Sequence, residues 1–125
     1  MKLKSDPRHI KRIKLMQKLF SWQFRPGNKA PKRILPIVDN LAQIDKLIAE
    51  GAPDRPISEI NKIDLSILRL AVFELIIEKD TPFKVIIDEA VELGKEFGSD
   101  SSGAFINGAL GKVVEIKKIK LCQQV

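Results

Sequence analysis

The chain has 125 residues, of which 22 are Lys or Arg and 16 are Asp or Glu, so its net charge is +6. This length suits one domain with a single hydrophobic core, and 44% hydrophobic with 30% charged residues is typical of a globular protein. No apolar stretch approaches the ~20 residues that cross a bilayer, and no export signal follows the basic N-terminus, so we expect a cytoplasmic protein without membrane contact. One cysteine cannot form an internal disulfide, and together with a single histidine it cannot supply the ligands of a zinc site, so we expect no metal and no cofactor.

The positive charge is concentrated at the N-terminal end. Residues 1–33 contain 11 Lys or Arg and one acid, whereas the remaining residues contain 11 Lys or Arg and 15 acids. Such a segment is typical of a surface that meets phosphates or an acidic partner. The alternative is a solvated basic helix that serves solubility, and the charge pattern alone favours neither.

Hydrophobic periodicity predicts helices in the first half of the chain. A first helix is expected over about 7–24, with Asp6 as its N-cap and Pro7 at its first position. Its apolar residues form one stripe and most of its cations lie off that stripe, so one side faces the core and the other faces solvent. Residues 25–33 predict a loop. A second helix is expected over about 34–50, closed by Gly51, and then a single helical turn at 56–60.

The second half of the chain also predicts helices only. Asn61 is the expected N-cap of a helix that is apolar on nearly all sides, which indicates a central, buried position. Thr81 begins the next helix, Gly98 ends it, and a last helix runs from Ser101 or Ser102 to about 119. No stretch alternates with the period of a strand. The sequence therefore predicts an all-α fold of five to seven helices.

The sequence shows no catalytic constellation. His9, the only histidine, lies in the basic helix, where we expect an exposed or phosphate-contacting imidazole. Four carboxylates are expected on the solvent face of their helix as hydrated surface rather than a catalytic pair: Asp88, Glu89, Glu92 and Glu96. The glycines of the last helix do not have the spacing of a phosphate-binding loop, and no strand precedes them. We therefore expect no catalytic residues and no enzyme activity.

Three glycines in the last helix need an explanation, because each costs about 0.5 to 1 kcal/mol relative to alanine. Gly108 and Gly111 lie on one face, where missing side chains would let another helix or a ligand approach, and tight helix packing is the favoured interpretation. Gly103 follows two serines at the helix start, where free N–H groups and the helix dipole favour an anion such as phosphate. For that position, anion binding and helix packing stay equal alternatives.

Several segments in order resemble the NusB family of bacterial transcription antitermination factors. The segments ILRLAVFELI, TPFKVIIDEAVELGKEFG and SGAFINGALGKV resemble its C-terminal half, and KLFSWQF resembles its first helix. The resemblance implies a NusB-like helical bundle that forms a single RNA-binding domain over 1–125, with an N-terminal part over 1–52 and a C-terminal part over 53–125. The segment between Trp22 and Asn61 is short for the family, which implies that one helix is lost or that two are merged. Lys11 and Lys18 stand where the family tends to have small residues.

The same resemblance implies a function. The protein would pair with the ribosomal protein NusE, bind boxA, a single-stranded element of nascent RNA, and join an antitermination complex on RNA polymerase that supports ribosomal RNA transcription. RNA would cross the basic first helix and the start of the last helix, which by position gives the RNA-binding residues Lys4, Arg8, His9, Lys11, Arg12, Ser101, Ser102 and Phe105. Cations suit phosphates and an aromatic ring can stack on an unpaired base, but Phe105 suits the core equally well. The NusE contact is implied near the start of the central helix, at Ile57, Asp64 and Leu65.

Two other functions stay open. A related domain is the N-terminal module of some ribosomal RNA cytosine methyltransferases, and that function would require a second polypeptide for catalysis. A helical protein–protein adaptor with an incidental basic arm would show no salt-dependent RNA affinity. A homodimer of the free chain also stays open. The leading hypothesis requires the cationic helix to lie beside the start of the last helix.

Overall fold

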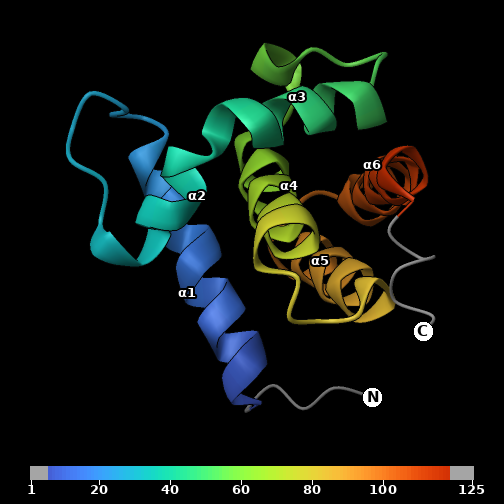
Figure 1. The fold of residues 1–125 in the computed structure, drawn as a ribbon, viewed down its shortest axis with the longest axis horizontal. Coiled ribbons are helices and arrows are strands. Elements are labelled where there is room, and N and C mark those ends of the chain that lie inside the picture. Colours follow the sequence, from blue (N-terminus) through green and yellow to red (C-terminus); the bar gives the residue numbers. More distant parts are fainter. Residues whose placement is uncertain (1–5, 119–125) are drawn as a thin grey trace.

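Six α-helices make up the fold, which a computed structural model describes for residues 6–118 (Figure 1). The helices are α1 (Pro7–Trp22), α2 (Leu35–Asp39), α3 (Leu41–Gly51), α4 (Lys62–Phe73), α5 (Phe83–Phe97) and α6 (Ser102–Lys117). Short 3-10 turns lie at Lys32–Ile34 and Ile57–Glu59, and a π-helical segment, Glu74–Glu78, extends α4. Residues 6–118 contain no strand, so the predicted all-α fold of five to seven helices is confirmed. No helix in this range is long and apolar enough to span a bilayer.

Helix α4 is the centre of the core. Helices α1, α3, α5 and α6 all pack on it, while α6 also packs against α3 and α5 (Figure 1). Nine of its 12 residues are buried, from Asp64 to Val72. A helix surrounded by neighbours has no solvent face to carry polar residues, which is why its sequence is apolar on nearly all sides. The predicted central position is confirmed.

Capping residues set several helix ends as the sequence predicts. The Asp6 carboxylate accepts the N–H of Arg8 at 2.8 Å at the start of α1, and the Asn61 side chain accepts the N–H of Ile63 at 2.8 Å at the start of α4. Such caps satisfy donors that have no partner inside the helix. Helix α5 begins one residue later than expected, because Pro82 rather than Thr81 occupies the N-cap position.

The single helix expected over 34–50 is wrong, because the chain turns at Asn40 between α2 and α3. The Asn40 side-chain amide donates to the carbonyl of Pro36 at 2.7 Å. The backbone N–H of Asn40 bonds instead to the carbonyl of Ile37 at 3.1 Å. The side chain thus occupies the carbonyl that a continuing α-helix would use, and the two short helices diverge. Helix α1 ends at Trp22, two residues before the expected end.

The glycines that permit close packing are not those expected from the sequence. A Cβ at Gly108 or Gly111 would meet nothing within 4 Å outside the backbone of its own helix, so the tight-packing interpretation is wrong for both. Close approach occurs instead at Gly51, where a Cβ would lie 2.7 Å from the carbonyl oxygen of Ala109, and at Gly94, where it would lie 2.7 Å from a side chain of α6. Packing of α3 and α5 onto α6 therefore depends on glycines of α3 and α5.

Candidate nucleic-acid interface

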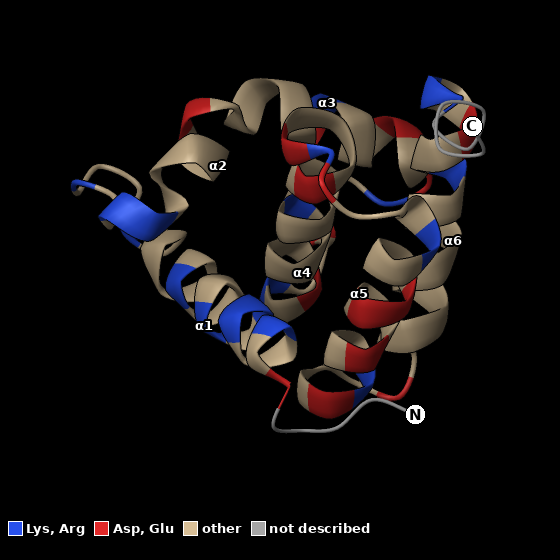
Figure 2. Cartoon of the chain, turned by 60° about the horizontal axis from the view of Figure 1, so that its bottom comes forward, with Lys and Arg blue, Asp and Glu red and all other residues tan. Residues whose placement is uncertain are grey.

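Exposed cations form a row along α1. In Figure 2, Lys and Arg gather on α1, whereas Asp and Glu mark α5. Arg8, Lys11, Lys14 and Lys18 are all exposed and are spaced by three or four residues, so they share one side of the helix. At 1.5 Å per residue this row extends over about 15 Å. We call these four residues the cationic stripe.

Three members of the cationic stripe form no ion pair in the described residues, although Glu78 interacts electrostatically with Lys11. Lys11, Lys14 and Lys18 form no ion pair with any residue in the range 6–118. Arg8 pairs with the capping Asp6 at 3.3 Å, but 83% of the Arg8 side chain is exposed. The hydrogen bond from Arg8 lowers the pKa of the Asp6 carboxyl. Because such an exposed pair is weak, the stripe can bind an anionic ligand from solvent.

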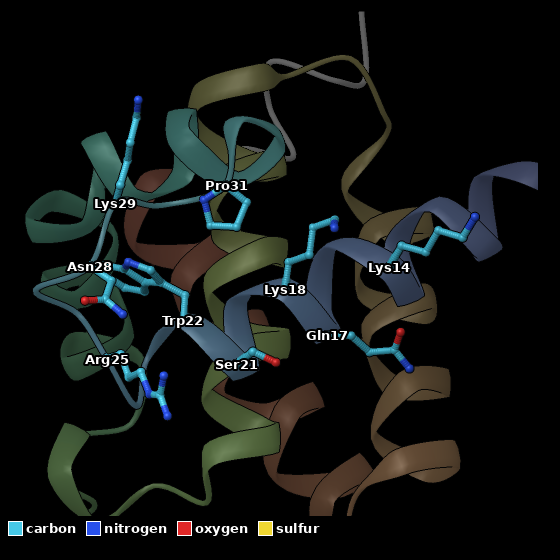
Figure 3. Close-up of a pocket in the computed structure, with 9 residues that line it drawn as sticks. All are labelled: Lys14, Gln17, Lys18, Ser21, Trp22, Arg25, Asn28, Lys29 and Pro31. Atoms are coloured by element: carbon cyan, nitrogen blue, oxygen red, sulfur yellow. The ribbon is translucent and has the colours of Figure 1, made fainter.

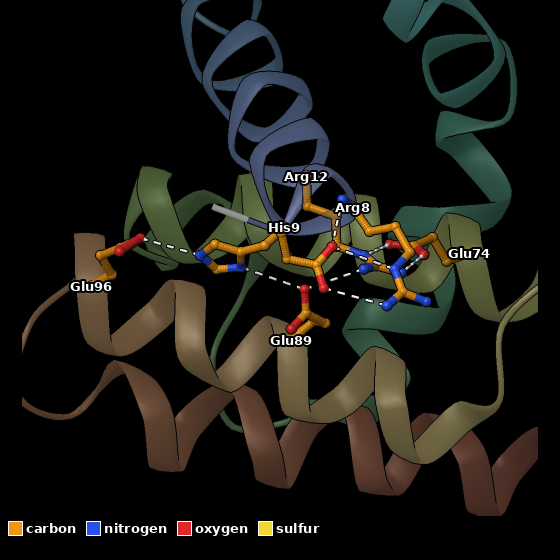
Figure 4. A network of polar contacts seen from close by, with 7 residues as sticks. Arg8, His9, Arg12, Glu74, Glu89 and Glu96 are labelled. Carbon is orange, nitrogen blue, oxygen red and sulfur yellow. Dashed lines mark hydrogen bonds and ion pairs between the residues drawn. The ribbon is translucent and has the colours of Figure 1, made fainter. Parts of the chain in front are cut away.

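Arg12 does not belong to this stripe, because it faces the interior. Its Nε and Nη2 donate to the two carboxylate oxygens of Glu74 at 2.9 and 2.7 Å, and its Nη1 donates to Glu89 at 3.2 Å (Figure 4). Only 11% of the Arg12 side chain is exposed. The Glu74 hydrogen bond raises the pKa of Arg12, so the cation persists. The expected solvent position is wrong, because a buried Glu74 requires a charged partner and Arg12 supplies it.

His9 is also buried, and the expected exposed imidazole is wrong. Its Nδ1 lies 3.4 Å from the Oε1 of Glu89, and its Nε2 lies 3.7 Å from the Oε1 of Glu96 (Figure 4). Glu89 is 2% exposed, so its expected solvent position is wrong as well, whereas the other three carboxylates of α5 are exposed. The first turns of α1 are therefore held on α5 and the end of α4. We call His9, Arg12, Glu74 and Glu89 the buried charge network, and Glu96 lies at its exposed edge.

The start of α6 presents two of its three predicted RNA-binding residues to the surface. Ser102 is fully buried, and its Oγ accepts the N–H of Ser99 at 2.9 Å, so it closes the turn between α5 and α6. Ser101 is exposed. Phe105 is half-buried against the core, and the guanidinium carbon of Arg55 lies 4.1 Å from the centre of its ring. Phe105 thus contacts the core and carries a cation on one face.

The two regions expected to contact RNA, the start of α1 and the start of α6, both lie near the end of α5. His9 in the first turn of α1 approaches Glu96 near the end of α5, and α6 begins after the short connection over 98–101. The Glu96 carboxylate lies at this junction, so the positive surface is interrupted there. Lys4, which was also predicted to bind RNA, lies outside the described residues.

The predicted partner site is mostly interior. Asp64 and Leu65 are each 3% exposed, because the helices around α4 cover them. Little of either side chain is exposed for direct contact, and their part in partner binding stays a prediction. Ile57, in the turn before α4, is half-buried and keeps some surface.

One candidate site was missed by sequence reasoning. A pocket of about 520 Å³ lies between the last turns of α1 and the loop that follows (Figure 3). We call it the loop pocket, and its charged and aromatic lining residues are Lys14, Lys18, Trp22, Arg25 and Lys29. The signal for it was the helical spacing of cations that continues from Lys11 through Lys14 and Lys18 to Arg25.

Comparison with known proteins identifies the family. The NusB family model matches residues 28–115, which is more than half of the chain. The chain belongs to the NusB family. The transcription antitermination protein NusB of Treponema denticola is 40% identical over 101 residues, which cover 75% of this chain and 74% of that protein. The NusB of Roseiflexus castenholzii is 50% identical over 78 residues, and this match spans about half of the relative, 55% of its length.

Solved structures show the same NusB fold. The NusB of T. maritima superposes with a TM-score of 0.80 at 32% identity, covering 88% of this chain and 92% of that chain. A chain in a structure described as "Crystal Structure of a Plectonemic RNA Supercoil" has a TM-score of 0.78 at 24% identity, which shows a shared fold. The expected NusB-like bundle is confirmed. Among residues 6–118, no group of three or more His, Cys, Asp or Glu side chains could hold a metal ion.

Proposed function

We propose that this NusB-family chain is a transcription antitermination factor that binds single-stranded boxA-type RNA together with the ribosomal protein NusE, in the cytoplasm, to support ribosomal RNA transcription. The name of its relatives, transcription antitermination protein, supports the biological role. The observation that carries RNA binding is the cationic stripe. A row of exposed cations, three of them without an ion pair inside residues 6–118, suits a phosphodiester backbone, because bound cations release the counterions of the phosphates.

Burial divides the predicted RNA-binding residues into two roles. Arg8 and Lys11 are exposed and would contact phosphates directly. Three residues with little exposed surface would hold α1 and α6 in place without touching RNA: the buried His9 and Ser102, and Arg12, whose side chain is 11% exposed. The role of Lys4, and the division into an N-terminal part over 1–52 and a C-terminal part over 53–125, stay predictions.

The start of α6 would supply contacts to bases. The guanidinium of Arg55 lies over the ring of Phe105, and Arg55 itself is exposed. Unpaired RNA bases stack on aromatic rings and on guanidinium planes. We therefore propose that a base stacks at this pair, with Ser101 nearby as a hydrogen-bonding group. NusE would bind near Ile57, at the turn that precedes α4.

RNA binding can be tested with charge-removing variants. Labelled boxA-type and scrambled RNA are titrated with the full chain at several salt concentrations, with and without NusE. The logarithm of the RNA affinity of the native chain should fall linearly with the logarithm of the salt concentration, with a slope of roughly 0.7 for each phosphate contacted. The variant Arg8→Gln/Lys11→Gln should make that slope shallower by about 1.4. The matched control Lys46→Gln/Lys84→Gln removes two exposed cations on α3 and α5 and should bind like the native chain.

The outcomes separate the alternatives. A salt-independent affinity, or the same loss in the control as in the stripe variant, would contradict the proposal and favour a protein–protein adaptor. Equal affinity for scrambled RNA, with NusE present, would refute the boxA assignment alone and favour a less specific RNA-binding module, as expected for a methyltransferase partner. Phe105→Ala should cost about 1 to 3 kcal/mol of RNA affinity if a base stacks there.

A further inference from the structure

The loop pocket has fixed walls. On one side, α1 is anchored to α4, because the side-chain amide of Gln23 donates to the carbonyl of Lys62 at 3.1 Å and to the Oγ of Ser66 at 2.9 Å. On the other side, the loop makes successive turns, in which the N–H of Arg25 bonds to Trp22 and that of Asn28 bonds to Arg25. Because these bonds hold the backbone on both sides, a ligand would require ordering of side chains but little rearrangement of the backbone.

The lining of the loop pocket is cationic. Lys14 and Lys18 come from α1 and Arg25 and Lys29 from the loop, as Figure 3 shows, and no carboxylate lines the pocket. All four cations are exposed, and within residues 6–118 none of their side chains has an ion pair or a hydrogen bond. Four like charges around one concave surface raise the local positive potential, because no neighbouring charge offsets them. The pocket is therefore suited to an anion.

Two further features indicate which anion. Trp22 lines the same pocket, so an aromatic ring lies among the cations, a combination that suits the bases and phosphates of an unpaired strand. Lys14 and Lys18 belong both to the pocket and to the cationic stripe, so a strand bound along the stripe would reach the pocket without leaving positive surface. Three of the four pocket cations, Lys14, Lys18 and Arg25, lie before residue 28, where the match to the NusB family model begins. The family-model match therefore does not itself indicate the loop pocket.

We propose that the loop pocket binds single-stranded RNA that continues along α1 from the cationic stripe, with phosphates at Lys18 and Lys29 and a base against Trp22. The inference rests on the proposed RNA binding and extends it to the opposite end of α1. The pocket, at about 520 Å³, is within the size range of small-ligand sites and can accommodate a nucleotide.

The test uses two signals on the full chain. Trp22 is the only tryptophan and the chain has no tyrosine, so protein fluorescence reports on this pocket. Single-stranded RNA long enough to span the stripe and the pocket is titrated while Trp22 emission is followed, and the anisotropy of labelled RNA gives total binding in parallel. We expect both signals to change over the same concentration range.

A charge-removing variant gives the magnitude. Lys18→Gln/Lys29→Gln replaces two exposed side chains and should weaken RNA binding about 25-fold at roughly 0.1 M salt, since each phosphate contact contributes about five-fold there. The salt slope should become shallower by about 1.4. Lys46→Gln/Lys84→Gln is again the matched control, and thermal melts verify that each variant is folded.

The outcomes separate this inference from the proposed function. If RNA binds and weakens with Arg8→Gln/Lys11→Gln, but Trp22 emission and the affinity of Lys18→Gln/Lys29→Gln stay native, the pocket assignment is overturned and the proposed function stands. If only the pocket variant weakens binding, the pocket is supported and the phosphate contacts proposed at Arg8 and Lys11 are refuted. If the native chain binds no RNA, both fail. If polyglutamate but not RNA changes Trp22 emission, the ligand is an acidic protein and the RNA assignment is wrong.

Discussion

Replacing Arg12 tests whether the buried charge network holds α1 on the core. Arg12 donates three hydrogen bonds of 2.7 to 3.2 Å to Glu74 and Glu89, whose side chains are 8% and 3% exposed. In Arg12→Ala these carboxylates stay buried without their cation. Removing one partner of such a pair typically costs about 3 to 5 kcal/mol, because a charge is left uncompensated in a region of low dielectric constant.

This loss is a large part of the stability of an ordinary domain, which is about 5 to 15 kcal/mol. For a chain of this size it corresponds to a decrease in melting temperature of roughly 10 to 20 °C. Urea unfolding followed by circular dichroism would measure the free energy of unfolding. Arg8→Ala is the matched control, since Arg8 lies one turn away with 83% of its side chain exposed and should change the free energy by less than about 0.5 kcal/mol.

The double variant Arg12→Met/Glu74→Met refines the test. Replacing both partners with apolar side chains removes the uncompensated charge on Glu74, so this variant should be more stable than Arg12→Ala. A loss below about 1 kcal/mol in Arg12→Ala would refute the account of α1 docking. It would indicate that Arg12 is available to RNA, as the sequence alone suggested.

Two further predictions concern helix packing and pH. Gly108→Ala should raise the free energy of unfolding by about 0.5 to 1 kcal/mol, because alanine favours the helix more than glycine and no neighbouring atom obstructs its Cβ. Gly51→Ala should lower the free energy of unfolding, because its Cβ would lie 2.7 Å from a carbonyl oxygen of α6. Urea midpoints that shift in the same direction would contradict this packing. Burial and the nearby charge of Glu74 raise the pKa of Glu78 above its usual value, so ionisation of Glu78 destabilises the folded state as pH rises. Glu78→Gln should therefore raise the melting temperature at neutral pH, and this gain should vanish once the pH falls below about 4, where the carboxyl is protonated in both states. A gain that persists in acid would rule out this cause.

Local features were readable from the sequence. Asp6 and Asn61 cap their helices through bonds to N–H groups two residues away, and such short-range chemistry needs no information from the rest of the chain. The central position of α4 could be predicted in the same way. A helix that is buried on every side has apolar residues on every side, and this pattern lies within one segment of the sequence. The segments that resemble NusB were recognised from sequence alone, and the family match over 28–115 confirms the three in the second half of the chain.

The division of the cations on α1 was decided by tertiary structure. Helical spacing showed that most of the cations lie off the apolar stripe, but Arg12 is paired because Glu74 and Glu89, 62 and 77 residues further along the chain, lie opposite it. The helix break at Asn40 also depends on a local competition between side-chain and backbone hydrogen bonds that periodicity does not detect.

The sequence also did not predict which glycines lie against a neighbouring helix. The sequence locates glycines on a face of α6, but whether a neighbour approaches a glycine depends on how separate helices cross. Close approach occurs at Gly51 and Gly94 of the neighbouring helices, and open space surrounds Gly108 and Gly111. The sequence by itself determined the all-helical fold class, the caps at Asp6 and Asn61, the central helix and the family. Only the packed structure decided which charges are neutralised and which surfaces are free, because both depend on residues distant in the chain.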